Sequence, residues 1–363
     1  MRKIIDWLND SKYINSLSPA CKMCAKGSKM VLLLTGLCPS NCFYCPLSFE
    51  KLGKDRIYAD EWELENEKDT DKLISEAKYI DAEGAGFTGG DPLIVWERTK
   101  KYIELLKKNF STNFHIHLYT SGLKNYQKIP DLAKVGLDEI RFHPNLKDYN
   151  KMENSQVKKA IDIALDSDID VAIEIPVLPS KEKEIIDLIT WADKKGINWI
   201  NLNELEFSET NADALINKKY DVKDDISSAV KGSEKTAYNV LKFFEKKNIC
   251  IGLHYCSSSF KDGIQLRNRI LRRAKNVSKT YEKITEDGTL LKGIILVKSD
   301  PETFVKKLKQ KYHPGSIFHN KEKNRIETSV EIVREISNDK KLECFIIEEY
   351  PTADRLEVER IPL

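Results

Sequence analysis

Three cysteines in one short loop constrain this chain of 363 residues more than any other feature. An apolar run that reads as a strand, MVLLLTG, begins at Met30, and Cys38, Cys42 and Cys45 follow it with the spacing C-x3-C-x2-C. A [4Fe-4S] cluster normally has four thiolate ligands, so three leave one iron open to another molecule. We therefore predict a [4Fe-4S] cluster on these three cysteines; a zinc knuckle or inert buried thiols are the alternatives.

The spacing resembles the signature of the radical S-adenosylmethionine (AdoMet) superfamily, and Tyr44 matches the aromatic residue that usually precedes the last cysteine. In that superfamily the open iron chelates the amino and carboxylate groups of AdoMet. The resemblance covers roughly residues 28–206 and implies that a reduced cluster splits AdoMet into methionine and a 5′-deoxyadenosyl radical, which abstracts hydrogen from a substrate. It also implies a low-potential electron donor, such as a flavodoxin or a ferredoxin, as a partner.

The composition indicates a globular protein without a membrane segment. Hydrophobic residues make up 41% of the chain and charged residues 32%, with a mean hydropathy of −0.46. The N-terminus lacks an apolar run of signal-peptide length, so we expect a cytoplasmic protein. Five of the eight cysteines fall within residues 21–45 at metal-ligand spacings, which favours metal binding over disulfides. A net charge of +2 predicts no general attraction to nucleic acid or membrane.

Strand-like and helix-like segments alternate through the first two thirds of the chain. This alternation predicts βαβ units with a parallel sheet. Six or seven units make a partial parallel (β/α)6-type barrel, short of the full eight. The expected strands are 31–35, 84–88, 115–120, 139–143, 170–178, 199–205 and 249–255, and the expected helices begin at Thr70 or span 96–109, 124–135, 155–166, 181–195 and 234–247.

The pattern changes near residue 260, where we expect a domain boundary. Strand-like 292–298 and 342–348, with helix-like 301–311 and 328–337, indicate a small α+β domain. We therefore divide the chain into an N-terminal extension (1–29), the barrel (30–256), a basic linker helix (257–283) and a C-terminal α+β domain (284–363).

Two motifs at the ends of expected strands resemble AdoMet-binding stretches of the superfamily. Gly89 and Gly90, followed by Asp91, resemble its Gly-Gly-Glu-Pro motif, which binds the amino group of AdoMet, with aspartate in place of glutamate. Ser121 lies in a Thr-Ser-Gly stretch that resembles the Thr-Asn-Gly of the pyruvate formate-lyase activating enzyme branch, near the AdoMet ribose. Ordinary turns between strand and helix are the alternative for both.

Two charged residues on neighbouring expected strands are further candidates. Glu174 begins a stretch that resembles the Arg-x-Pro-Val-Ile-Pro-Gly of the same branch, with glutamate where an arginine near the AdoMet carboxylate is common. It is predicted to accept hydrogen bonds from ribose or substrate, or to pair with Arg141. Arg141 shares a strand face with His143 and is predicted to bind the AdoMet carboxylate or a substrate anion.

A second metal site is predicted from cysteines outside the main loop. Cys21 and Cys24 form a C-x2-C pair, and His254 and Cys256 end the last expected barrel strand. Together they make a Cys3His set suited to zinc, or to an auxiliary iron-sulfur cluster; free thiols are the alternative. Cys250 and Cys344 are expected to be buried core thiols.

The substrate is left open by the sequence. The hypotheses are installation of a glycyl radical on a partner protein, modification of RNA, small-molecule biosynthesis, and electron transfer without AdoMet cleavage. The RNA hypothesis rests on residues 261–283, where eight basic residues stand against two acidic ones. A solvated helix that connects two domains explains the same run.

Overall fold

The computed structural model describes residues 3–225, 227–297, 300–339 and 342–363. The chain divides into two compact units. The first ends at Leu266 and lacks only residues 79–81, which belong with the second unit, residues 267–363. The predicted linker, 257–283, is therefore shared between the two units.

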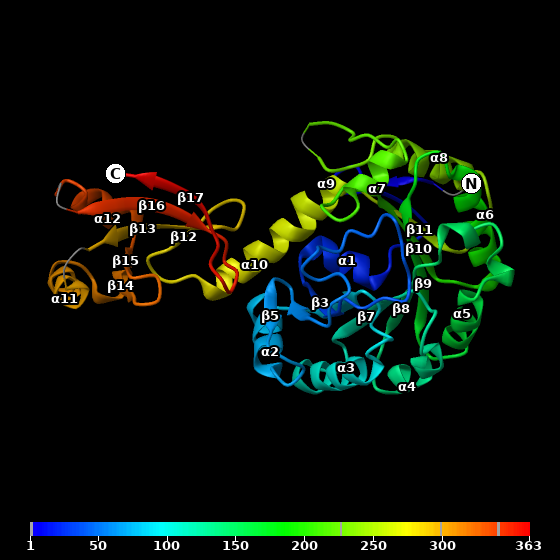
Figure 1. The fold of residues 1–363 in the computed structure, drawn as a ribbon, viewed down its shortest axis with the longest axis horizontal. Coiled ribbons are helices and arrows are strands. Elements are labelled where there is room, and N and C mark those ends of the chain that lie inside the picture. The colour runs from blue at the N-terminus through cyan, green and yellow to red at the C-terminus, as the bar shows by residue number, and fades with distance from the viewer. Residues whose placement is uncertain (1–2, 226, 298–299, 340–341) are drawn as a thin grey trace. The chain divides into compact units, whose positions relative to one another are not determined.

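A parallel sheet forms the centre of the first unit (Figure 1). Each strand pairs with the next along the chain, and the helices lie outside the curved sheet. The mixed α/β class with a parallel sheet is thus confirmed, while the (β/α)6-type barrel stays a prediction. The strands are β3 (Lys29–Thr35), β6 (Gly84–Gly89), β7 (His115–Thr120), β8 (Glu139–Phe142), β9 (Asp170–Val177), β10 (Trp199–Glu204) and β11 (Gly252–Cys256), and the outer helices are α2 (Thr70–Tyr79), α3 (Trp96–Phe110), α4 (Ile129–Lys134), α5 (Val157–Leu165), α6 (Glu182–Lys195) and α8 (Ser233–Glu245).

The outer helices form because their apolar residues recur on one face. In α3 the residues Thr99, Tyr102, Ile103 and Leu106 are buried at helical spacing, which is the pattern that predicted the helix. Helix α6 ends at Gly196, whose left-handed backbone (φ 83°) suits a residue without a side chain.

Both edges of the parallel sheet carry short antiparallel strands. On one edge, β2 (Lys12–Ile14) pairs with β11, and β1 (Ile5–Asp6) pairs with β2. On the other edge, β4 (Ile57–Ala59) pairs with β3, and β5 (Trp62–Leu64) with β4. Neither β4 nor β5 was predicted, because three-residue strands carry too little alternation to detect.

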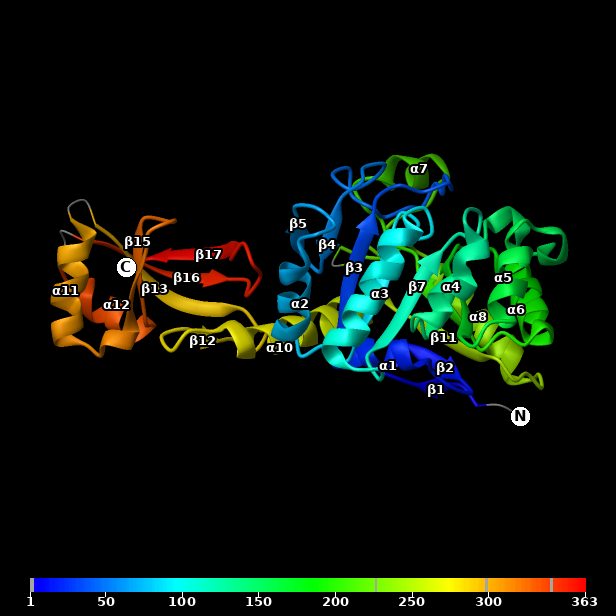
Figure 2. The same ribbon diagram turned by 90° about the horizontal axis from the view of Figure 1, so that it is seen from below.

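The N-terminal extension also contributes a helix, α1 (Pro19–Lys26), that was not predicted. It lies at the amino-terminal ends of the parallel strands (Figure 2). The Ser18 hydroxyl caps the helix by accepting a hydrogen bond from the Cys21 amide, and Pro19 takes the first helical position. Cys21 and Cys24 are therefore carried into the interior of the unit.

Shorter elements complete the first unit. They are α7 (Ala212–Asn217), α9 (Ser258–Phe260), the π-helix η4 (Lys261–Leu266), and the 3-10 turns η1 (Tyr126–Lys128), η2 (Leu146–Asp148) and η3 (Met152–Asn154). None of the helices in the described part of the chain combines the length and apolarity needed to cross a membrane.

The described part of the second unit is an antiparallel sheet with three helices, α10, α11 and α12. The strand order is β14-β15-β13-β16-β17, with β12 beside β13. The expected helices correspond to α11 and α12, and the expected strands to β13 and β16. Residue 298, the last of the expected strand 292–298, lies outside the described residues. The remaining strands of this unit were not predicted. The elements are α10 (Arg267–Val277), β12 (Lys283–Ile284), β13 (Leu290–Leu296), α11 (Pro301–Lys311), η5 (Pro314–Ser316), β14 (Ile317–Asn320), β15 (Arg325–Thr328), α12 (Val330–Ile336), β16 (Glu343–Glu349) and β17 (Glu357–Pro362).

Arginines of the basic run donate hydrogen bonds to backbone carbonyls of their own unit. Arg267 donates to the Glu286 carbonyl at 2.7 Å, and Arg272 to the Ile80 carbonyl at 2.7 Å. Arg273 donates to the carbonyl of Pro351. These three guanidinium groups hold the small unit together, which favours a structural role for the basic run.

Candidate active site at the carboxyl end of the parallel sheet

The cysteine loop leaves the carboxyl end of β3 and folds back on its own first residue. The Gly36 amide donates to the Lys54 carbonyl at 2.8 Å, and the Gly53 amide donates to the Gly36 carbonyl at 2.9 Å. A side chain at residue 36 would lie 1.6 Å from the Lys51 carbonyl oxygen, so only glycine fits. The loop that carries the cysteines is thereby closed at its base.

The Gly89-Gly90 turn after β6 packs directly against this loop. The Gly90 amide donates to the Thr35 carbonyl at 2.7 Å, and the Asp91 amide donates to the Leu37 carbonyl at 2.8 Å. A Cβ atom on Gly90 would lie 2.1 Å from the Leu37 oxygen. Close approach of two backbones therefore requires this glycine.

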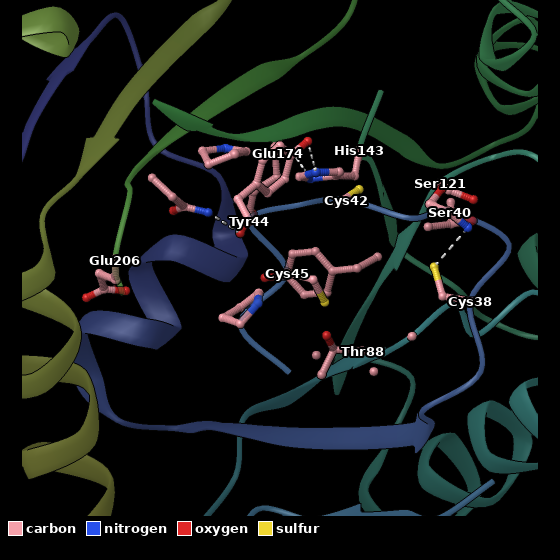
Figure 3. Close-up of a pocket in the computed structure, with 18 of the residues that line it drawn as sticks. Cys38, Ser40, Cys42, Tyr44, Cys45, Thr88, Ser121, His143, Glu174 and Glu206 are labelled. Carbon is pink, nitrogen blue, oxygen red and sulfur yellow. Dashed lines mark hydrogen bonds between the residues drawn. The ribbon is translucent and has the colours of Figure 1, made fainter. Parts of the chain in front are cut away.

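A cavity of about 430 Å³ opens where these two loops meet. All three loop cysteines line it, together with Tyr44, Gly89, Gly90, Ser121 and Glu174 of the predicted AdoMet set (Figure 3). The carboxyl ends of parallel strands are where open α/β folds place their chemistry. The structure thus brings six separate loops and strand ends to one cavity.

The donor set fits an iron-sulfur cluster. Cys38, Cys42 and Cys45 are free thiols, and thiolate sulfur is the ligand of such clusters. In the described residues no three His, Cys, Asp or Glu side chains are grouped as around a single metal ion. Each thiolate of a [4Fe-4S] cluster binds a different iron, so its ligands stand around a cubane and not around one point.

Burial keeps two of these sulfurs protonated before any metal binds. It raises the pKa of the Cys38 thiol to about 11, although the Ser40 amide donates to the sulfur at 3.4 Å and opposes the rise. Burial likewise raises the pKa of the Cys42 thiol. Loading iron on these groups must therefore release protons.

Tyr44 is fixed in place by the strands around it. Its hydroxyl lies 3.1 Å from Nε2 of His143, and Nδ1 of His143 lies 2.8 Å from the Glu174 carbonyl oxygen. The Asn211 side chain donates to the Tyr44 carbonyl at 3.2 Å, and Thr210 donates to the Cys45 carbonyl at 3.1 Å. The end of the cysteine loop is thus anchored on both sides.

Asp91, a predicted AdoMet contact, is turned away from the cavity. Its carboxylate is fully buried and accepts hydrogen bonds from the Thr120 hydroxyl at 2.8 Å and from the Ser121 amide and hydroxyl at 3.0 and 2.5 Å. Asp91 thereby connects the carboxyl end of β6 to that of β7. The longer side chain of a glutamate would connect them less closely. Ser121 shares this bond and still lines the cavity.

Arg141 also does not line the main cavity. Its guanidinium donates to Glu139 at 2.6 Å and to Glu174 at 2.5 Å. This is the ion pair that the sequence offered as the structural alternative for Glu174. Asn203 donates to the other Glu174 oxygen at 2.9 Å, so this carboxylate is held from two strands.

A smaller chamber of about 110 Å³ has Cys21, Cys24, His254 and Cys256 in its wall. All four are buried, and neither ring nitrogen of His254 has a hydrogen-bond partner. The four predicted ligands do share one chamber, but in the described structure they do not surround a single point. A second metal, zinc or an auxiliary cluster, stays a prediction.

Sequence reasoning missed several residues of the two cavities. Lys29, Tyr119, Glu206 and Lys261 line the main cavity, and none belongs to a motif. Tyr119 lies on the same face of β7 as His115 and His117, because the three residues are spaced by two. This spacing could have identified Tyr119 as a residue that faces the interior. Cys250 was expected to be buried and is exposed, because β11 begins three residues later than predicted; Cys344 is buried as expected.

Comparison with known proteins identifies related chains. The model of the radical SAM superfamily matches residues 32–192, and a domain of unknown function, DUF8061, matches residues 288–363. A protein of Methanocaldococcus jannaschii that carries the provisional name of glycyl-radical enzyme activating enzyme is 42% identical, over 96% of this chain and 93% of its own length.

Solved structures with a similar fold are more distant. Streptococcus suis SuiB bound to its precursor peptide SuiA is 12% identical with a TM-score of 0.46, covering 74% of this chain and 61% of SuiB. SuiB bound to S-adenosylmethionine is 10% identical with a TM-score of 0.44, covering 63% of this chain and 50% of SuiB. The chain therefore spans about half to three fifths of the length of these SuiB chains. The family match and the relative that is similar over nearly its whole length show that this chain belongs to the radical SAM superfamily.

Proposed function

We propose that the protein uses Cys38, Cys42 and Cys45 to hold a [4Fe-4S] cluster and cleaves AdoMet reductively in the main cavity. The observation that carries the proposal is that all three cysteines and the Gly89-Gly90 turn line one cavity. Membership of the superfamily implies both the cluster and AdoMet.

The chain's own residues would bind and orient AdoMet. The amides of Gly90 and Asp91 are already used, so the carbonyl oxygens of the glycine turn are left to accept from the AdoMet amino group. Ser121 and Glu174 offer oxygen atoms to the ribose, and Tyr44 walls the cluster side of the cavity. In this proposal Asp91 holds Ser121 in place and Arg141 holds Glu174, and neither of the two contacts AdoMet directly.

When bound, the reduced cluster supplies one electron to AdoMet, giving methionine and a 5′-deoxyadenosyl radical that takes a hydrogen atom from the substrate and becomes 5′-deoxyadenosine. A low-potential flavodoxin or ferredoxin would supply that electron. We interpret the curved parallel sheet around this cavity as a partial (β/α)6-type barrel.

For the substrate we propose a partner protein on which a glycyl radical is installed. The support is the relative from Methanocaldococcus jannaschii, which is similar over nearly the full chain, second unit included. RNA is less favoured, because three arginines of the basic run are used inside the small unit.

Formation of 5′-deoxyadenosine tests the chemistry. Anaerobically reconstituted protein given dithionite and AdoMet should release it, and Cys42→Ala should not. Cys250→Ala, which removes an exposed thiol outside both cavities, is the matched control and should behave as wild type. Full cleavage by Cys42→Ala would refute the assignment.

Deuterium transfer tests the substrate class. Protein, RNA and small-molecule fractions from cells grown on α-deuterated glycine are each supplied to the enzyme, and deuterium in 5′-deoxyadenosine is measured by mass spectrometry. Transfer from the protein fraction alone supports the proposal. Transfer from either other fraction, with none from protein, contradicts it.

A further inference from the structure

The smaller chamber, next to the main cavity, is lined by polar side chains, whereas the interior beside a parallel sheet is normally apolar. Five residues line both spaces, so the two adjoin. They are Lys29, Tyr119, Glu174, Asn203 and Lys261. Buried polar groups are costly unless they are partnered, so a chamber of this kind indicates a polar occupant.

One charge in this lining is not neutralised by a carboxylate. Each of the other charged Lys, Arg and Glu residues that line either space has a partner of opposite charge: Arg141 with Glu139 and Glu174, Lys261 with Glu206 at 2.6 Å, and Glu204 with Lys223 at 3.3 Å. No carboxylate among the described residues pairs with Lys29. Its nearest groups are His117, whose Nε2 lies 3.3 Å from the ammonium nitrogen, and the thiol of Cys24.

The backbone beside Lys29 is built to admit this side chain. Lys29 begins β3, and Gly86 lies on the neighbouring strand β6. A Cβ atom on Gly86 would lie 2.7 Å from Nε2 of His117 and 3.6 Å from Cε of Lys29. The missing side chain gives the lysine and the histidine room over the inner face of the sheet.

We propose that the chamber binds a carboxylate of the substrate and that Lys29 supplies the charge that selects it. The Lys29 ammonium group is part-buried and has no carboxylate partner among the described residues, and a substrate carboxylate would neutralise it. Arg141 and Lys261 also line the small chamber, but both are already paired with carboxylates. Lys29 is therefore the cation in this lining that an incoming anion can neutralise. The inference rests on the proposed function, since it names what the substrate of that site must carry.

Anomalous diffraction with bromide tests the anion site without knowledge of the substrate. Crystals of the full-length protein with its cluster reconstituted are soaked in sodium bromide. We expect a bromide peak in contact with the Lys29 ammonium group, present in wild type and Lys29→Arg and absent in Lys29→Met. Lys124→Met, which changes a lysine of a separate surface pocket, is the control and should keep the peak. No peak in the wild-type chamber, or zinc or a second cluster in it, would overturn the inference.

Calorimetry in the presence of AdoMet tests the carboxylate and its source. The probes are succinate and the capped peptide acetyl-Gly-Asp-Gly-amide, with the asparagine peptide as a neutral match. Lys29→Met should weaken binding about tenfold or more, because it removes a charge-assisted contact. Tighter binding of the peptide assigns the carboxylate to a protein segment, and tighter binding of succinate to a free acid. Equal binding by wild type and Lys29→Met, or by the aspartate and asparagine peptides, would overturn the inference.

Release of 5′-deoxyadenosine without substrate separates this inference from the proposed function. Loss of release in wild type would contradict the proposed function, whereas retained release with no anion in the chamber would contradict only the role of Lys29.

Discussion

Two lysines, one buried and one part-buried, show how differently the two units treat a charge inside the fold. Lys292, in the middle of β13, is 2% exposed, and its ammonium group lies 3.1, 3.0 and 2.8 Å from Glu282, Glu327 and Glu349. Lys29, at the start of β3, faces two cavities and pairs with no carboxylate among the described residues. The first charge is satisfied within the fold and is structural, whereas the second requires an anion from outside.

The largest expected difference is in stability. Lys292→Met should destabilise the second unit by about 3–5 kcal/mol, because three buried carboxylates lose their shared cation. Lys29→Met should leave the first unit unchanged or slightly more stable, because it removes an unneutralised charge. Urea unfolding followed by hydrogen exchange in β13 and β3 measures each unit separately. Equal losses in the two variants would mean that Lys29 is also structural.

Acid should weaken the ion pairs around Lys292 and so destabilise the second unit. Burial alone would raise the pKa of Glu327, but Lys292 and a hydrogen bond from Asn320 lower it to about 2 from its ordinary 4.5. Because the folded pKa is depressed, the stabilisation is present at neutral pH and is lost as the pH falls from about 5 to 2, by roughly 3 kcal/mol in all. Glu327→Gln should flatten the dependence of unfolding free energy on pH in that window; an unchanged slope would contradict the assignment.

A glycine beside each lysine allows a matched test of packing. A Cβ atom on Gly293 would lie 2.4 Å from Cβ of the buried Val333, so Gly293→Ala should cost about 1–3 kcal/mol of second-unit stability. Gly86→Ala would instead press on the ring of His117 and should weaken bromide binding near Lys29 more than it lowers stability. Thermal unfolding and bromide occupancy measure the two effects, and a reversed pattern would break the comparison.

The smallest effect is expected for a lysine on the surface. Lys311 lies 2.7 Å from Glu335, with both side chains more than half exposed. Solvent screens such a pair, so Lys311→Met should leave the unfolding free energy of the second unit unchanged within error. A clear loss would mean that exposed pairs, and not only buried ones, stabilise this unit.

Much of the first unit was predictable because its signals are local. The alternation of strands and helices predicted the parallel sheet, and helical spacing in α3 and α6 placed their ends within a residue. The cysteine loop was found from its spacing, and the glycine turn from its resemblance to a motif of the superfamily. Edge strands β4 and β5 and helix α1 were missed, because they are short and depend on pairing and packing with distant segments.

The sequence left the roles of Asp91 and Arg141 open: it offered AdoMet contact for both and, for Arg141, an ion pair with Glu174 as well. Each resembles a ligand contact by position, yet each is taken up by a partner on a neighbouring strand, Ser121 and Glu174. Hydrogen-bonding capacity is a property of a residue, but which partner uses it depends on strand register, which is a tertiary property.

The order of residues alone determined that three thiols stand on one loop after a buried strand, because ligand spacing and hydrophobic period are local. Only the tertiary structure decided which charges are neutralised inside the protein. Counter-charges come from segments far apart in the chain, and their meeting depends on how the strands pack. Lys292 is paired with Glu349, whereas Lys29 has no carboxylate partner among the described residues.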